Sequence, residues 1–234
     1  MNNTQSKLLL ALGAITLAPG IGAQEVDTSD WACEYCPFQQ GHEGDYEVSA
    51  GSVSDDSAYF GNATGYDEEG AYGNLDGEGS YASGAYRMDW TVEDLGLDSR
   101  VAELEGSHAG KFDYNIGFRQ LPYRQFNTTS TIFAESGNSL LLPQGWVRAP
   151  TTDGFTELDS SLVSRNIESD RSIYEIGGRY LAGSRWSFSL DYRRQENEGT
   201  KIQGGSVFSN SSLLPMPFDY VTDEVDFAVR YGAD

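Results

Sequence analysis

The sequence predicts an all-β protein, an antiparallel transmembrane β-barrel of the outer membrane, of which this chain supplies the N-terminal strands. Apolar and polar residues alternate with a period of two along several segments, Tyr and Trp recur near the segment ends, and the connections are alternately short and long. A soluble β-sandwich would show the same alternation, with its apolar face toward a core. The polar face carries charges of both signs, which suits a water-filled lumen and therefore favours the barrel.

Residues 1–23 form the first predicted element, a secretory signal peptide. Lys7 precedes the apolar run LLLALGAITLAPGIGA, and small residues lie near Ala23. The run is too short to span a bilayer as a helix. We therefore expect the mature protein to be exported, to the cell outer membrane of a Gram-negative bacterium.

Residues 24–44 are predicted to form a periplasmic segment that contains the C-x-x-C pair, Cys33 and Cys36. Haem attachment needs a histidine directly after the second cysteine, and Pro37 occupies that position. A zinc site needs two further ligands, of which His42 could supply one. A thioredoxin-like centre needs a βαβ fold, which the alternating pattern does not offer. Two interpretations stay open: a disulfide that closes a very short loop, or a dithiol with a role in assembly.

Residues 45–234 contain the predicted barrel strands. The alternation is clearest in RMDWTVED, KFDYNIGFR, RWSFSLDYRR and VDFAVRYG, and it is weaker in SIYEIGGRYL. Further strands with smaller side chains are predicted at YEVSAGSV, SAYFGNATGY and SRVAELEG. Tight turns are predicted within 105–111 and 182–185, and long loops within 120–169 and 196–221. This alternation is typical of short periplasmic turns and long external loops.

The predicted strands do not complete a barrel. The pattern indicates about nine strands, whereas closed bacterial barrels normally have an even number. The chain ends in YGAD rather than in the terminal aromatic residue expected of a mature outer-membrane barrel. An open sheet edge is not tolerated in lipid. We therefore expect further strands to follow, so that this chain is the N-terminal part of a larger barrel.

Composition excludes several functions. The formal net charge is -21, which leaves no basic footprint for nucleic acid. The 14 Tyr, 11 Phe and 4 Trp residues argue against disorder. The sequence contains no G-x-S-x-G or H-E-x-x-H motif and no phosphate-binding loop. We therefore predict a protein that is not an enzyme and has no catalytic or metal-binding residues.

An ordered set of motifs resembles the MtrB/PioB family of outer-membrane β-barrels. It begins with the signal peptide, the W-x-C-x-x-C segment at 31–36 and the Gly-rich alternating strands. NSLLLPQGWV at 138–147 resembles the family's leucine-proline-x-x-tryptophan loop. SSLLPMPFDYVTDEVDFAVRY at 211–231 resembles its proline–aspartate–tyrosine–threonine–aspartate segment. The resemblance covers nearly all of the mature chain, and members of the family are much longer.

The resemblance implies a non-catalytic sleeve for extracellular electron transfer. Such barrels hold a periplasmic multihaem c-type cytochrome in the lumen and let it contact an extracellular multihaem cytochrome. Because this chain has two histidines and no C-x-x-C-H motif, we expect it to bind no cofactor itself, and the haem c to belong to its partners. The alternatives are a solute porin or channel of the outer membrane, or a secreted soluble binding protein.

The polar face of the predicted strands supplies the candidate contacts with the enclosed partner. For each of these residues two interpretations stay open: it contacts the cytochrome, or it forms an ion pair with a neighbouring strand. The ten residues predicted to face the lumen are Arg87, Asp89, Asp113, Arg119, Glu175, Arg179, Asp191, Arg193, Asp226 and Arg230.

Overall fold

The computed structural model describes residues 40–232 apart from 137–138 and 208–209. All of the described residues belong to one unit, Phe38–Asp234. The predicted signal peptide and residues 24–39 of the predicted periplasmic segment, with Cys33 and Cys36, lie outside them, whereas residues 41–44 of that segment are part of the first strand. No helix among the described residues is long and apolar enough to cross a membrane.

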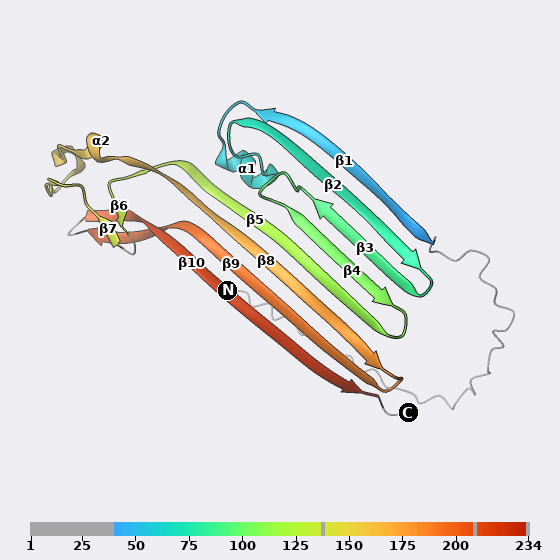
Figure 1. The fold of residues 1–234 in the computed structure, drawn as a ribbon. Helices are drawn as coiled ribbons and strands as arrows, with labels where there is room; N and C mark the ends of the chain where they lie inside the picture. Colours follow the sequence, from blue (N-terminus) through green and yellow to red (C-terminus); the bar gives the residue numbers. More distant parts are fainter. Residues whose placement is uncertain (1–39, 137–138, 208–209, 233–234) are drawn as a thin grey trace, which may run out of the picture. The chain divides into compact units, whose positions relative to one another are not determined.

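An antiparallel sheet of eight strands, in the order β1-β2-β3-β4-β5-β8-β9-β10, forms most of the described structure (Figure 1). Except at the insertion between β5 and β8, each strand pairs with the strand that follows it in the chain. The strands are β1 Gly41–Val53, β2 Gly70–Ser83, β3 Tyr86–Glu93, β4 Val101–His108, β5 Phe112–Thr131, β8 Val163–Ala182, β9 Trp186–Val207 and β10 Asn210–Tyr231. The predicted antiparallel all-β class is therefore confirmed.

The strands are joined by short connections at one end of the sheet, which we call the turn end. These connections are residues 84–85, 109–111 and 183–185. Each contains a glycine with positive φ, as at Gly84 (φ 60°) and Gly183 (φ 70°), a conformation that glycine adopts without steric cost. Tight turns were predicted at two of these places, and both are confirmed.

The opposite end of the sheet, which we call the loop end, carries the longer connections. Residues 54–69 contain α1 (Ala58–Thr64). Residues 132–162 contain the hairpin of β6 (Ala134–Ser136) and β7 (Ser139–Leu141), the 3-10 turn η1 (Thr152–Gly154) and α2 (Leu158–Ser161). Figure 1 shows these elements gathered at the same end of the strands.

The predicted strand at SAYFGNATGY is wrong, because α1 occupies it. Ser57 caps the helix, and its Oγ accepts a hydrogen bond of 3.2 Å from the Phe60 amide. Gly65, at φ 74°, ends the helix in the left-handed conformation. The main sheet thus has eight strands rather than about nine.

The predicted long loop at 196–221 is also wrong, because this segment is paired strand. Asn210 lies opposite Val207, so that β9 and β10 are joined by only two residues. Pro215 and Pro217 lie on β10, which is an edge strand among the described residues, and an edge strand tolerates a missing N–H. The predicted loop at 120–169 is shorter than expected, because β5 continues to Thr131 and β8 starts at Val163.

Candidate functional site: the inner face of the sheet

The strand register places all ten predicted lumen residues on one face of the sheet. Residues directly opposite each other in an antiparallel pair project from the same face. Asp113 lies opposite Arg179, and Glu175 lies opposite Arg193. The pairs between successive strands from β3 to β10 place all ten residues on the same face of the sheet. We call this the inner face and the other the outer face, after their predicted positions toward lumen and lipid.

Four inner-face arginines form ion pairs within the sheet itself. The nitrogen–oxygen distances are 2.7 Å for Arg87–Asp89, 2.7 Å for Arg119–Glu103, 2.7 Å for Arg179–Asp113 and 3.0 Å for Arg193–Glu175. The last three pairs join neighbouring strands. Arg119, Arg179 and Arg193 thus have ion-pair partners on neighbouring strands, whereas Arg87 pairs within β3. Contact of the ten residues with a partner stays a prediction. Since the side chains are roughly half exposed, each pair contributes only about 0.2–1 kcal/mol.

Glu103, the partner of Arg119, is a residue that the sequence prediction missed. It lies on β4 in SRVAELEG, where the small and acidic side chains gave no clear polar face. Arg119 lies sixteen residues further along the chain. Only the register, which sets Glu103 opposite Gly117, brings the two charges together.

Three of the ten predicted residues, Asp191, Asp226 and Arg230, have no ion pair among the described residues. Asp191 lies directly opposite Asp226 on β10, an arrangement of like charges that destabilises a sheet. Both aspartates line a hollow of about 210 Å³ together with Glu175 and Glu224. Arg193 lines the same hollow and pairs with Glu175, so Asp191, Asp226 and Glu224 are the carboxylates of this hollow that have no ion pair among the described residues.

A second acidic region on the inner face was not predicted. Asp45 on β1 lies opposite Glu78 on β2, and Glu47 lies opposite Asp76. With Glu93, these four residues line a hollow of about 330 Å³. The alternation of acidic with other residues in EGDYEVS could have predicted that the β1 carboxylates share one face. Even so, no group of three or more His, Cys, Asp or Glu side chains in the described part of the chain is arranged to hold a metal ion.

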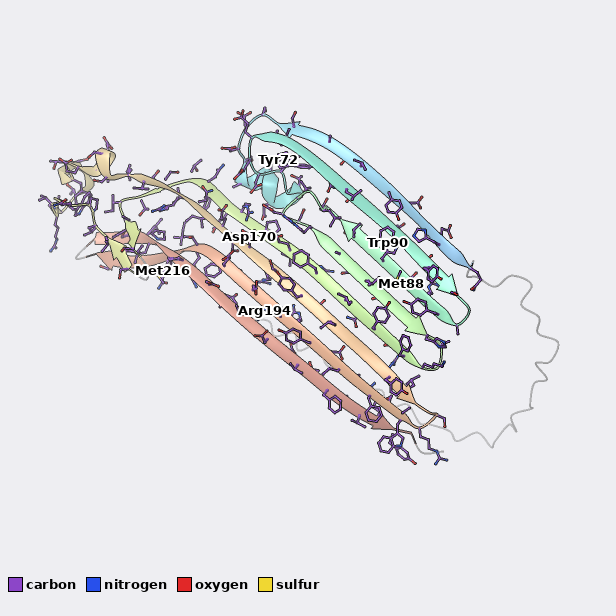
Figure 2. The ribbon with its side chains drawn as sticks, in the orientation of Figure 1. Tyr72, Met88, Trp90, Asp170, Arg194 and Met216 are labelled. Carbon is purple, nitrogen blue, oxygen red and sulfur yellow. The ribbon has the colours of Figure 1, made fainter. Side chains whose placement is uncertain are left out.

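The outer face is apolar from the turn end to about the middle of the long strands. Figure 2 shows Met88 and Trp90 in this part of β3. Aromatic rings contact one another at Phe118–Tyr174, with centroids 5.1 Å apart, and at Trp186–Tyr231, with centroids 4.7 Å apart. The apolar outer band consists of Met88, Trp90, Val92, Leu104, Phe112, Ile116, Phe118, Tyr174, Ile176, Tyr180, Trp186, Phe188, Leu190, Tyr192, Val225, Phe227, Val229 and Tyr231.

Toward the loop end the same outer face becomes charged. On β9 the change comes directly after Tyr192, where Arg194 forms an ion pair of 2.8 Å with Glu196. On β8, which runs from the loop end to the turn end, the change lies between Asp170 and Tyr174, and Asp170 (Figure 2) is on the outer face. The charged outer belt consists of Arg124, Glu168, Asp170, Arg194, Glu196, Glu198, Asp219 and Asp223.

Arg124 is the most enclosed charge of this belt, with 8% of its surface exposed. Its guanidinium bonds Asp67 in the β1–β2 connection at 2.7 Å, Asp170 on β8 at 3.0 Å and Asp98 in the β3–β4 connection at 3.3 Å. Its amide donates to Asn62 of α1 at 3.0 Å. Burial alone would lower the pKa of Arg124, but the hydrogen bonds and charges of Asp67 and Asp170 outweigh it and raise the pKa. The charged side chain thus joins two loop-end connections to β5 and β8.

Two comparisons with known proteins show what the chain is similar to. Residues 52–234 match the model of the MtrB/PioB outer membrane β-barrel porin family. The chain is also similar to the outer membrane protein MtrB of Shewanella baltica (strain OS185), with 29% identity over 97% of this chain. It spans 34% of the length of that curated relative.

Proposed function

Because the chain belongs to the MtrB/PioB family of outer membrane β-barrel porins, we propose that it forms part of a barrel wall that encloses a periplasmic multihaem c-type cytochrome. The wall lets that cytochrome contact an extracellular multihaem cytochrome, so that electrons cross the outer membrane on the haems of the partners. The chain itself is a non-catalytic sleeve, exported through its signal peptide. The turn end faces the periplasm and the loop end faces the outside, as the lengths of the connections favour.

The observation that carries the proposal is the opposite character of the two faces along the same strands. The outer band presents large apolar side chains to its surroundings, for example Leu190 at 54% and Phe227 at 67% exposure. Such a surface is stable in lipid and unfavourable in water. The inner face at the same level holds ion pairs such as Asp113–Arg179, which need water or a polar partner.

The acidic inner face favours a second candidate function, a channel for small cations. Asp45, Glu47, Asp76 and Glu78 would attract cations into an open lumen. In a sleeve, by contrast, a protein fills the lumen and ions do not pass freely.

Purification of the full-length protein from its native membrane in mild detergent separates the two functions. The sleeve predicts a haem-staining partner that stays bound through size exclusion, and low conductance of the complex in planar bilayers. A barrel that carries no haem partner and conducts cations would establish the channel and overturn the sleeve.

A further inference from the structure

The inner face also changes character along the strands, in the opposite sense to the outer face. Toward the turn end it carries the ion pairs described above. Beyond Arg119 and toward the loop end, two adjacent rows of opposed residues replace them. These rows are Leu121–Arg171–Asn197–Tyr220 and Tyr123–Ser169–Gly199–Phe218. We call the side chains of Leu121, Tyr123, Phe218 and Tyr220, with Arg171 and Asn197, the inner patch.

Three of the four large side chains of the inner patch are exposed, whereas the fourth, Phe218, lies beneath the Lys201 ammonium, which is 5.7 Å from the centre of its ring. Leu121 is 43% exposed, Tyr123 53% and Tyr220 46%. A water-filled lumen is lined by polar side chains, as the turn half of this same face is. A group of exposed aromatic and aliphatic side chains instead marks a surface that another molecule covers.

Lipid is not the molecule that covers the inner patch. At the same level of the strands the outer face carries the charged outer belt, with Asp170, Glu198 and Asp219 in one row. Charges on that side place this level beyond the hydrocarbon of the bilayer. Here the strands resemble a water-soluble sheet, with its polar face toward solvent and its apolar face toward protein.

Asn197 gives an independent sign of a missing contact. The residue is 6% exposed, and its Nδ2 donates a hydrogen bond of 2.6 Å to the Tyr220 hydroxyl. Its Oδ1 is buried and accepts no hydrogen bond among the described residues. Buried acceptors without a partner are rare in native proteins. A donor from an occupant of the inner patch, after a small shift of the Tyr220 side chain, would satisfy this oxygen.

We propose that the inner patch is the docking surface through which the barrel wall binds the enclosed cytochrome, at the extracellular half of the lumen. This inference rests on the proposed sleeve function and locates its contact. Tyrosine and arginine are enriched among residues that dominate the energy of protein interfaces, and the patch combines both with apolar neighbours. The charged residues nearer the turn end are mostly paired with one another and contribute less to binding of the enclosed protein.

Site-specific photo-cross-linking tests the proposal in the full-length protein, produced together with its haem partner. The cross-linking residue p-benzoylphenylalanine replaces Tyr123 or Tyr220 in the inner patch. The matched control is Val221, which neighbours Tyr220, is also 46% exposed and projects from the outer face. A second control is Asp226, on the inner face nearer the turn end. We expect roughly tenfold more haem-staining adduct from the inner patch than from Val221.

Other outcomes overturn the proposal in distinguishable ways. Haem adducts from Asp226 but not from Tyr123 or Tyr220 would leave the sleeve standing and remove the docking surface. Adducts of Tyr220 with the 132–162 connection of its own chain would show that the barrel covers the patch itself. The absence of any co-purified haem partner would overturn the sleeve and the docking surface together.

A salt wash provides a second readout. Apolar contacts resist high salt, whereas contacts between exposed charges are screened. We expect the native complex to keep its haem partner in high salt, and a Leu121→Ser/Tyr220→Ser double variant to lose most of it. Val221→Ser, as the matched variant, should keep it. If both variants retain the haem partner equally, at equal barrel levels in the membrane, the inner patch does not bind that partner.

Discussion

Arg124 and Asp67 lie 57 residues apart in the chain and are joined by a hydrogen bond of 2.7 Å between Nε and Oδ2. Because Arg124 also bonds Asp98 and Asp170 and lies 3.7 Å from a carboxylate oxygen of Glu168, one side chain compensates four carboxylates from three different segments. We expect Arg124→Met to destabilise the protein by about 2–4 kcal/mol, since among the described residues it leaves these carboxylates close together with only Arg100, the partner of Asp98, to compensate them. The urea midpoint of the full-length protein in detergent micelles measures the effect.

Arg119→Met is the control for that prediction. Arg119 forms its ion pair with Glu103 at the same distance of 2.7 Å, but both side chains are about half exposed. We expect this variant to lose less than about 1 kcal/mol. Equal losses from the two arginines would show that Arg124 does not anchor the loop-end connections.

The sequence predicted the faces of the sheet well because alternation is a local property. In KFDYNIGFR and RWSFSLDYRR each face is apparent within nine or ten residues, and the structure confirms both segments as strands with those faces. The partners across the sheet could not be predicted in the same way. The pairing of Arg119 with Glu103 depends on register, which only the folded sheet specifies.

The failure to predict strand at residues 196–221 has a physical explanation as well. Residues 196–221 contain Gly199, Gly204, Pro215 and Pro217, which favour a loop by composition. Their charged outer face lacks the apolar alternation of the outer band, because this part of β9 and β10 lies beyond it. Tertiary pairing of two long strands overrides these local signals.

The carboxylates Asp191 and Asp226 face each other, and removing one of these charges should stabilise the protein, unlike the arginine substitutions above. Because like charges directly opposite each other destabilise a sheet, Asp226→Asn should stabilise the protein by about 0.2–1 kcal/mol. Asp113→Asn is the matched change on the same face, and it should destabilise slightly because Asp113 pairs with Arg179. Urea unfolding of both variants in the same micelles tests the signs. A lower midpoint for Asp226→Asn would indicate that a cation bridges the two aspartates.

The cysteine pair is predicted to act in assembly rather than in electron transfer. A disulfide between Cys33 and Cys36 would close a very short loop, so its entropic stabilisation is below the roughly 3 kcal/mol of a fifteen-residue loop. We expect the Cys33→Ala/Cys36→Ala variant to lower the amount of barrel in the outer-membrane fraction. The haem content of each complex that does form should not change. Immunoblots and haem staining of the same fractions measure both quantities, and unchanged barrel levels would contradict the prediction.

The position of the bilayer on the outer face can be tested with one introduced charge at two heights. Leu190 lies in the outer band opposite Phe227, whereas Val221 projects from the same face beside the charged outer belt. We expect Leu190→Arg to cost about 2–4 kcal/mol of folding free energy in lipid vesicles, because the charge would lie in hydrocarbon. Val221→Arg should cost less than about 1 kcal/mol, because Val221 lies opposite Glu196 and Asp223 follows on the same face of β10. Equal costs at the two positions would mean that the membrane extends past the charged outer belt, and the inner patch would then lie within the bilayer rather than beyond it.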